Sequence, residues 1–414
     1  MTTTSHDTKV KVMLNMIIKN ESKTIERCLE SVKDWVDGIC ICDTGSTDDT
    51  LTILDTWKKE RNMENFFVKS EPWVDFGHNR TLAIDFAHSV IPTEERKDWY
   101  LLFLDADMEL TIQTIQKEEE KSLWNENSIF DDFKQQILPT FDIWYTLQKL
   151  HTLSYTNIRW IRANMKVECK GPTHEYYDIL TKEATISTTP DWLIIEDRGD
   201  GGSKQDKFKR DVQLLKKALE KEPSNTRNWF YLANSYRDLG ENEQACRAYT
   251  QRLKLGGWKE EMYMSLIYLG DTLCRFKELS YDVQAIKAWL DAFDIQPNRV
   301  EALYRLCRYY RIQKRYQLAK LFYDKGMEIC SSTSFHNFTT FSLFPLFYEH
   351  DIEKYLWKFE LSIFAYYLSH GGEKEKGRKA CQDLLELHST YPIPEDIIGH
   401  VIENLKLYDG LKIE

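Results

Sequence analysis

Asp105 and Asp107 stand one residue apart at the end of an apolar run, residues 99–104. A run of this length without Gly or Pro is typical of a strand that is buried on both faces of a parallel sheet. Because unpaired carboxylates are costly to bury, we expect the strand to emerge into water here or to meet a cation. Two hard oxygen ligands so close together suit Mg²⁺ or Mn²⁺ carried in by a diphosphate. An ordinary Asp-rich turn is the alternative for this motif taken alone.

Two earlier segments also predict strands that end in polar residues. Residues 9–18 lead into Asn20 and Glu21, and residues 38–42 lead into Asp43. Each is followed by an amphipathic helical pattern, and this repeated order is typical of a parallel sheet. Right-handed connections place the strand ends on one edge of the sheet, where open α/β folds bind ligands. The loops contain neither Gly-x-Gly-x-x-Gly nor Gly-Lys-Ser/Thr, so a dinucleotide fold or a P-loop is unsupported.

Three short runs resemble a known family. Residues 20–22 are Asn-Glu-Ser, residues 43–48 are Asp-Thr-Gly-Ser-Thr-Asp, and residues 104–107 are Leu-Asp-Ala-Asp. Together they resemble the start of a family 2 glycosyltransferase of the GT-A type, with its Asp-x-Asp motif. The resemblance covers roughly the first half of the chain. It implies a Rossmann-like α/β domain that transfers a sugar, with inversion, from a nucleotide-sugar (above all a UDP-sugar) to an acceptor hydroxyl, helped by Mn²⁺ or Mg²⁺.

The resemblance assigns the nucleoside side of the site to four residues. Asp43 would accept a hydrogen bond from the nucleotide base, and Asn20 and Glu21 would lie beside the same nucleoside. Arg80, which follows Gly-His-Asn, resembles the Arg that opens the third helix of this family and faces the donor. We expect that helix over residues 81–88. A salt bridge at a helix start is the alternative for Arg80.

The phosphate side of the donor is assigned in the same way. Asp105 would reach the ribose or a metal-bound water, and Asp107 would bind the metal directly. The Gly-rich stretch 197–204 ends in Lys204 and could close over the donor diphosphate, although an interdomain linker is the alternative. Relatives have a His near this point and this chain has none, which leaves the closure of the phosphates open.

A Gly-Pro turn at residues 171–172 precedes His174 and Glu175. Several family 2 members resemble this pattern of His followed by an acid. His174 could complete the metal shell, and Glu175 could act as the base that deprotonates the acceptor hydroxyl. An exposed polar turn is the alternative, in which case Asp191, Asp142 or the substrate itself would be the base.

From residue 208 onward the apolar period is helical. Small and large residues recur at the spacing of a tetratricopeptide repeat, in which neighbouring helix pairs bury each other's apolar faces. About four irregular units fit, and an unrelated helical bundle is the alternative. They lie around residues 229–249, 285–297, 303–323 and 380–392. The predicted fold is therefore α/β plus all-α, with a GT-A domain over 1–203 and a helical repeat domain over 204–414.

The bulk composition limits the kinds of partner and the cell compartment that the sequence predicts. A net charge of −11 argues against a nucleic-acid partner. No apolar run approaches the ~20 residues of a membrane helix, the polar start is unlike a signal peptide, and the nine Cys form no Cys-x-x-Cys pair. These features predict a cytoplasmic protein. The acceptor is expected to be a glycan, a peptide or a protein. The repeats are expected to help choose it, and the alternatives are that they only stabilise the transferase domain or form a homodimer. A repeat scaffold with an inactive transferase half is the competing function.

Overall fold

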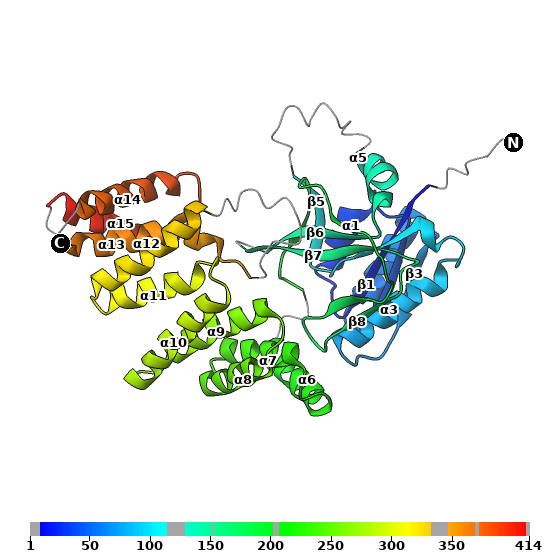
Figure 1. Ribbon diagram of the computed structural model, residues 1–414. Coiled ribbons are helices and arrows are strands. Elements are labelled where there is room, and N and C mark those ends of the chain that lie inside the picture. The colour runs from blue at the N-terminus through cyan, green and yellow to red at the C-terminus, as the bar shows by residue number, and fades with distance from the viewer. Residues whose placement is uncertain are drawn as a thin grey trace. The chain divides into compact units, whose positions relative to one another are not determined.

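The structure, a computed structural model, describes residues 9–113, 129–150, 153–201, 207–332, 347–368 and 372–410. The chain divides into two compact units, Met1–Lys221 and Glu222–Glu414, which are described separately (Figure 1). Helix α6 (Lys207–Lys221) belongs to the first unit, so the packing boundary follows this helix. The domain boundary expected at residue 203 stays a prediction.

The first unit is built on a nine-stranded sheet in the order β3-β2-β1-β4-β7-β6-β11-β5, with β10 paired to β6. Strands β3, β2, β1 and β4 are parallel, β7 is antiparallel to both β4 and β6, and β5 is antiparallel to β11. The strands are β1 (Lys11–Ile18), β2 (Gly38–Asp43), β3 (Phe66–Ser70), β4 (Trp99–Phe103), β5 (Met108–Ile112), β6 (Ile143–Leu150), β7 (Leu153–Arg162), β10 (Ile186–Thr188) and β11 (Leu193–Asp197). A second sheet pairs β8 (Val167–Lys170) with β9 (Tyr176–Ile179).

Both faces of the parallel strands are buried, as the apolar runs predict. Alternate residues of β1 point to opposite faces: Leu14 packs in the cluster that contains α1 and α2, whereas Met13 packs with residues of α3. Asn15 faces the α3 side, where its amide donates to the Ala83 carbonyl at 2.8 Å. The helices of this unit are α1 (Ile25–Val32), α2 (Thr50–Arg61), α3 (Phe76–Val90), α5 (Ile129–Asp132), α6 and the short turns η1 (Arg96–Asp98), η2 (Phe133–Ile137) and η3 (Leu138–Thr140).

Strand β5 corrects an expectation. The charged pattern from residue 111 predicts a solvated helix, but Thr111 and Ile112 end a strand that pairs with β11. The rest of that predicted helix, residues 114–127, lies outside the described residues. The β-branched and aromatic residues of 141–147 and 158–162 predict two antiparallel strands, and β6 and β7 confirm them.

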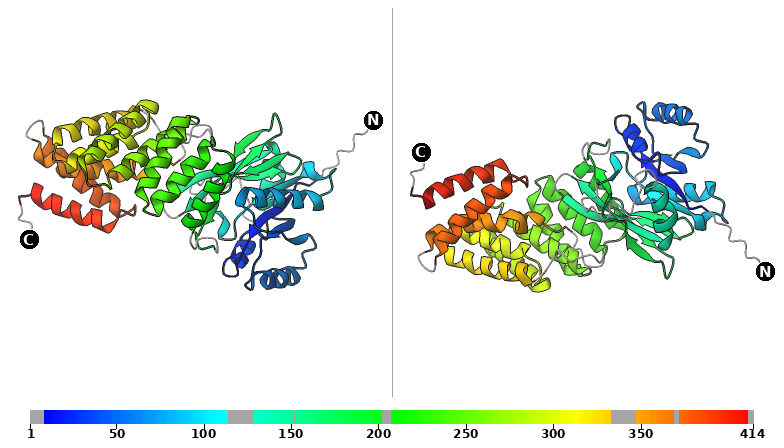
Figure 2. Two further views of the ribbon diagram at one scale, coloured as in Figure 1. Left: turned by 90° about the horizontal axis from the view of Figure 1, so that it is seen from below. Right: turned by 90° about the horizontal axis from the view of Figure 1, so that it is seen from above.

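The second unit consists of stacked helix pairs, which confirms the predicted helical repeats (Figure 2). Small residues let the helices of a pair approach: a Cβ added to Gly270 of α9 would overlap the indole of Trp289 on α10. The pairs are α7 (Thr226–Asp238) with α8 (Asn242–Leu255), α9 (Lys259–Leu273) with α10 (Leu279–Ile295), α11 (Glu301–Ile312) with α12 (Tyr316–Ser332), and α13 (Trp357–Phe364) with α14 (Glu373–His388). They are accompanied by η7 (Ile352–Leu356), η8 (Ala365–Tyr367) and α15 (Glu395–Tyr408).

Buried charges inside the second unit are paired. Arg299 donates to Glu301 at 2.5 Å and to Glu260 at 2.6 Å, and the Tyr263 hydroxyl donates to Glu301 at 2.9 Å. Because Glu301 is fully buried, it cannot bind water, and these hydrogen bonds replace the ones that it would make to water in the unfolded chain. The ion pairs therefore join α9 to the start of α11.

All nine cysteines are free, and six of them are buried. Within the described residues, no helix combines the length and the apolar character that a membrane crossing requires.

Candidate active site at the carboxyl edge of the sheet

The carboxyl ends of three neighbouring parallel strands meet at one edge of the sheet. Ile18 of β1 is in register with Asp43 of β2, and Asn15 of β1 is in register with Phe103 of β4. The polar residues that follow these strands therefore emerge together, as the right-handed connections predict. This edge brings Asn20, Glu21, Asp43 and Asp105 into one region, which is where ligands bind in open α/β sheets.

The loops after β1 and β2 are tied to each other by hydrogen bonds. The Asn20 backbone N–H donates to Ser46 Oγ at 2.9 Å, and the Thr47 N–H donates to Asn20 Oδ1 at 2.7 Å. The Glu21 N–H donates to Thr50 Oγ1 at 2.8 Å. Asn20 is in the left-handed region with φ 57°, a conformation that Asn adopts more readily than most residues. The two loops that are predicted to contact the nucleoside are thus held together by hydrogen bonds.

Asp43 is buried and holds its own loop. Its carboxylate accepts from the N–H groups of Gly45 and Ser46, both at 3.1 Å. Gly45 has φ +101°, a left-handed conformation that favours glycine. This loop fixes the orientation of Asp43, and its hydrogen bond to a nucleotide base stays a prediction.

Asp48 links the same two loops and was not among the predicted site residues. Its carboxylate accepts from Thr50 Oγ1 at 2.5 Å and from the Ser22 N–H at 3.2 Å. Although burial raises its pKa, these hydrogen bonds outweigh burial and lower the pKa of Asp48 to about 2. The run Ser-Thr-Asp after Asp43 is the sequence signal that could have identified it.

Arg80 joins the two halves of the candidate site. Its buried guanidinium donates from Nε to Glu175 Oε1 at 3.0 Å and from Nη2 to Asp105 Oδ1. Burial alone would lower its pKa, but Asp105, Tyr177 and Glu175 raise the pKa of Arg80 well above its ordinary value. One cation therefore bridges the acid after β4 and the acid that was predicted to be the base.

The position of Arg80 within its helix differs from the prediction. Helix α3 begins at Phe76 instead of residue 81, because Asp75 caps it by accepting from the His78 N–H at 2.8 Å. Arg80 therefore lies one turn inside α3, where it forms ion pairs with Asp105 and Glu175. Its contact with the donor stays a prediction, and a structural salt bridge stays the alternative.

The turn before Glu175 docks on the first turn of α3. The N–H groups of Phe76 and Gly77 donate to the carbonyl oxygens of Pro172 and Gly171, at 3.2 and 3.0 Å. This contact sets the distance between Glu175 and Arg80. Sequence spacing could not reveal it, because α3 and the turn are far apart in the chain.

Asp105 and Asp107 differ in exposure, although the sequence predicts the same for both, namely that they emerge into water or meet a cation. The side chain of Asp105 is 37% exposed, but Asp107 is buried. The loop after β11 covers Asp107: the Gly201 N–H donates to Asp107 Oδ2 at 3.1 Å, and the Arg198 N–H donates to its carbonyl at 3.0 Å. The Asp107 carboxylate is thus held by a hydrogen bond from the backbone of Gly201.

The chemistry of this donor set fits a divalent cation carried by a diphosphate. Asp105 and Asp107 offer carboxylate oxygens and His174 an imidazole, which are ligands that Mn²⁺ accepts, while Mg²⁺ prefers the oxygens. The described part of the chain holds no group of three or more His, Cys, Asp or Glu side chains placed to enclose a metal. Such ions use few protein ligands when phosphates complete the shell, so the three-residue set stays a prediction.

Part of the first unit matches a known protein family. Residues 15–174 match the family described as Glycosyl transferase family 2. This segment is a family 2 glycosyltransferase domain. It contains every predicted site residue except Glu175, which follows it directly, and Lys204. Residues 214–247 match the tetratricopeptide repeat, from within α6 to within α8.

Similar proteins agree with both parts. The chain is 27% identical over 243 residues to the SPbeta prophage-derived glycosyltransferase SunS of Bacillus subtilis, covering 56% of this chain and 51% of that protein. It is 36% identical over 104 residues to a TPR repeat-containing protein of Synechococcus elongatus, covering 25% of this chain and 22% of that protein. The chain therefore spans about half the length of the glycosyltransferase that it matches. Among solved structures, a tetratricopeptide repeat protein of Parabacteroides merdae has 16% identity and a TM-score of 0.37, over 50% of this chain and 68% of that one.

A buried polar network behind Asp105 and Asp107 was missed by the sequence analysis. Arg159 of β7 donates to the Phe103 carbonyl at 3.2 Å and to Gln148 Oε1 at 2.5 Å. Gln148 donates in turn to Asp197 at 3.2 Å and to Tyr155 at 2.7 Å. The network ties the ends of β4, β6, β7 and β11 together, and scattered polar residues within strands gave no local signal for it.

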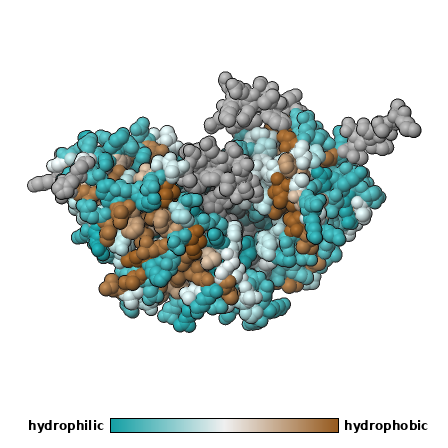
Figure 3. Space-filling model, viewed as in Figure 1, coloured by the Kyte–Doolittle hydropathy of each residue, from teal (hydrophilic) through white to brown (hydrophobic). Residues whose placement is uncertain are grey.

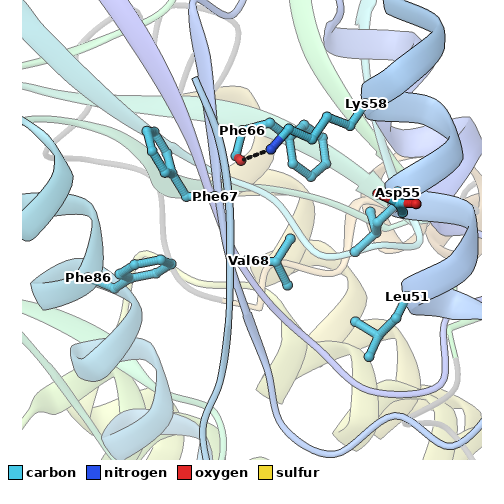
Figure 4. A pocket seen from close by; sticks show the side chains of 8 residues that line it. Leu51, Asp55, Lys58, Phe66, Phe67, Val68 and Phe86 are labelled. Atoms are coloured by element: carbon cyan, nitrogen blue, oxygen red, sulfur yellow. Dashed lines mark hydrogen bonds between the residues drawn. The ribbon is translucent and has the colours of Figure 1, made fainter. Parts of the chain in front are cut away.

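Two further features concern the limits of the candidate site. Lys204, predicted to contact the diphosphate, lies outside the described residues. A depression at the β3 edge of the family 2 domain is lined by side chains of α2, β3 and α3, and none of the predicted site residues lines it (Figure 4). There the Lys58 ammonium donates to the Phe66 carbonyl at 3.0 Å. We therefore place the candidate site at the strand ends and not in this depression.

Proposed function

We propose that this protein transfers a sugar from a nucleotide-sugar, above all a UDP-sugar, to a hydroxyl of a glycan, peptide or protein. The observation that supports this most directly is the bridge from Asp105 through Arg80 to Glu175, inside or next to the family 2 domain. The two carboxylates proposed to act on the donor and on the acceptor hydroxyl are thus held by one guanidinium.

Donor binding is proposed for the tied loops after β1 and β2. Asn20, Glu21 and Asp43 would contact the nucleoside, and Lys204 would approach the diphosphate. The hydrogen bonds that already fix Asn20 and Asp43 support this, since a preorganised loop loses little entropy on binding. Asp105 would reach the ribose or a metal-bound water.

Asp105, Asp107 and His174 are proposed to hold Mn²⁺ or Mg²⁺. When bound, the ion would neutralise charge that develops on the leaving diphosphate. Arg80 would keep Asp105 and Glu175 in fixed positions while the donor binds. Asp107, buried under Gly201, would keep its orientation in the same way.

In the proposed reaction, Glu175 takes the proton of the acceptor hydroxyl. The acceptor oxygen then forms a bond to the anomeric carbon, and the bond from that carbon to the diphosphate oxygen breaks on the opposite side. The electron pair leaves with the nucleoside diphosphate, and the sugar is inverted. Positioning and proton transfer together are the contributions that the chain's own residues make.

The helical unit is proposed to help select the acceptor. Stacked repeats form extended binding surfaces, and this unit exposes large apolar side chains at Leu279, Val283 and Leu321. Figure 3 shows apolar residues among hydrophilic ones on the viewed face of the repeats. Homodimer formation through these helices is the alternative use. The nine free thiols are consistent with a cytoplasmic location, which is part of this proposal.

A nucleotide-sugar screen tests the proposal. We expect UDP and one UDP-sugar to raise the unfolding temperature of the full chain in the presence of Mn²⁺, and chelation by EDTA to remove the effect. Slow release of UDP from the same sugar in the absence of acceptor should accompany binding. A chain that neither binds nor hydrolyses any nucleotide-sugar would instead be a repeat scaffold with an inactive transferase half.

A further inference from the structure

Asp211 is a fully buried carboxylate that no sequence pattern singled out. It lies on α6, outside the matched family 2 segment, yet one of its oxygens is 3.9 Å from His174 Nε2. The other oxygen is 3.7 Å from Arg210 Nε. A residue beyond the family segment thus contacts a residue proposed for the donor site.

Helix α6 is held against this part of the first unit by a second contact. The Arg210 guanidinium lies 5.3 Å from the ring centre of Phe76, the first residue of α3. Since the turn that contains His174 also docks on the start of α3, the helix and the turn share one support. The approach of Asp211 to His174 is therefore fixed from both sides.

Burying Asp211 is costly, and its surroundings compensate only in part. Its side chain is fully buried, and the charged or ionisable groups near it include Arg210 Nε at 3.7 Å and His174 Nε2 at 3.9 Å. A purely structural position would be filled more favourably by an apolar residue of similar volume. The retained carboxylate therefore calls for a functional reason.

His174 is the neighbour that gives such a reason. Its side chain is 34% exposed, so the ring has one nitrogen against Asp211 and remains accessible to a ligand. Its backbone is left-handed with φ 51°, a conformation that is uncommon for residues other than glycine. The turn holds this conformation in a position where the imidazole meets the buried acid.

We propose that Asp211 is a positioning residue that orients His174 and selects its tautomer. The nearest carboxylate oxygen lies 3.9 Å from Nε2, an electrostatic contact that is longer than a hydrogen bond. Its negative charge favours a proton on Nε2, so that Nδ1 keeps the lone pair and could bind the donor's metal ion. This inference depends on the proposed function only for the identity of the ligand that Nδ1 would bind. The Asp211–His174 pairing itself is a property of the chain.

The first test measures the tautomer of the His174 imidazole by NMR. In the full chain labelled with ¹⁵N-histidine, long-range ¹H–¹⁵N spectra report the tautomer of each ring, and His174→Gln assigns the signals of His174. We expect the Nε2–H tautomer in the wild type and a shift toward a mixture in Asp211→Asn, which keeps the size of the side chain. His174 signals that are identical in both proteins would overturn the inference, whether or not the protein transfers sugars.

The second test measures whether the effects of substituting Asp211 and His174 depend on each other, with Mn²⁺-dependent UDP binding as the readout. Asp211→Asn should weaken Mn²⁺-dependent UDP binding about 10-fold or more, the usual effect of losing a carboxylate behind a metal-binding His. In the His174→Gln background the same change should have no further effect. An equal loss in both backgrounds would show that Asp211 acts without His174 and would overturn the proposal.

A matched control is Asp37→Asn at the opposite edge of the sheet. Asp37 accepts from the Val12 N–H and from the Lys134 ammonium, both at 2.8 Å, and is far from the strand ends in the β1 register. It should change neither the His174 signals nor UDP binding. Wild-type protein without any UDP affinity would refute the proposed function, and the spectra would still decide the Asp211–His174 pairing.

Discussion

Gly77 and Gly171 touch backbone to backbone: the Gly77 amide donates to the Gly171 carbonyl oxygen at 3.0 Å, and a Cβ on Gly77 would lie 2.6 Å from the same oxygen. The turn that leads to Glu175 can therefore approach α3 only because residue 77 has no side chain. This relationship sets the reach from Arg80 to Glu175. The lack of a side chain at Gly77 therefore helps to set the position of Glu175, the proposed base.

Gly77→Ala should reduce sugar transfer more than it reduces stability. The turn has to move away from α3, which we expect to cost about 1–3 kcal/mol of unfolding free energy as overpacking does. Transfer should fall further, because Glu175 moves with the turn. Denaturant unfolding and kcat measured on the same preparation separate the two effects.

Gly399→Ala in α15 is the control for that prediction. Its Cβ would meet nothing within 4 Å, so the change should leave the protein equally stable or more stable by about 0.4–1 kcal/mol. Unimpaired transfer by Gly77→Ala would mean that the Gly77–Gly171 contact does not position the base.

Asp107→Asn should abolish Mn²⁺-dependent UDP binding. The amide has no charge for the metal, but its oxygen can still accept from the Gly201 N–H, so unfolding free energy should change by no more than about 1 kcal/mol. Calorimetric titration of UDP with and without Mn²⁺ measures the effect, with the exposed Asp55→Asn of α2 as a control. Unchanged metal-dependent affinity would remove Asp107 from the metal site.

Glu175→Gln should slow transfer by about 10²-fold or more while donor affinity stays near normal, because the amide cannot take the acceptor proton. Arg80 Nε can still donate to the amide oxygen, so the local structure should persist. Steady-state kinetics and UDP titration measure the two quantities. Glu168→Gln, on the same hairpin and exposed, should be normal. Normal turnover by Glu175→Gln would move the role to Asp191, Asp142 or the substrate.

Asp48→Asn should be less stable than the wild type at neutral pH, and this difference should shrink in acid. The folded pKa of about 2 lies below the ordinary 3.8, so the ionised carboxylate stabilises the fold above pH 3.8. That stabilisation is lost as the pH falls toward 2. Urea unfolding at pH 7, 4 and 3 tests the trend. Asp49→Asn is a matched control because Asp49 makes no side-chain cap to α2, and a pH-independent difference would refute the role of the Asp48 charge.

A fragment that ends at Lys221 should bind UDP and hydrolyse the sugar donor slowly, but lose transfer to the true acceptor. It retains α6 and hence Asp211, which a fragment that ends at residue 203 would lack. Circular dichroism first establishes that the fragment is folded. Full acceptor transfer by the folded fragment would exclude the repeats from acceptor selection.

Much of the fold follows from local pattern. The apolar run before Asp105 predicts β4, and three polar strand ends predict their common edge because parallel strands with right-handed connections leave no other choice. The repeats were visible for a related reason: their packing depends on neighbours in sequence, so small and large residues recur with a fixed period.

The parts that escaped prediction depend on distant partners. β5 follows Asp107 directly and is a strand because β11 pairs with it, whereas its own sequence passes into a charged segment. The first turn of α3 contains Gly77 and Asn79, poor helix formers, and is helical because Asp75 caps it and the turn at Gly171 docks on it. Asp211 is one charge among several on α6, and only the fold shows which of them is buried.

The nine free cysteines have a practical consequence. Burial raises the pKa of the six buried thiols, to about 11 at both Cys42 and Cys381. Because the thiolate is the reactive form, these side chains should resist alkylation and peroxide at neutral pH. Cys274 is exposed, so it is the native thiol to replace before fluorophores are attached to cysteines introduced at chosen sites.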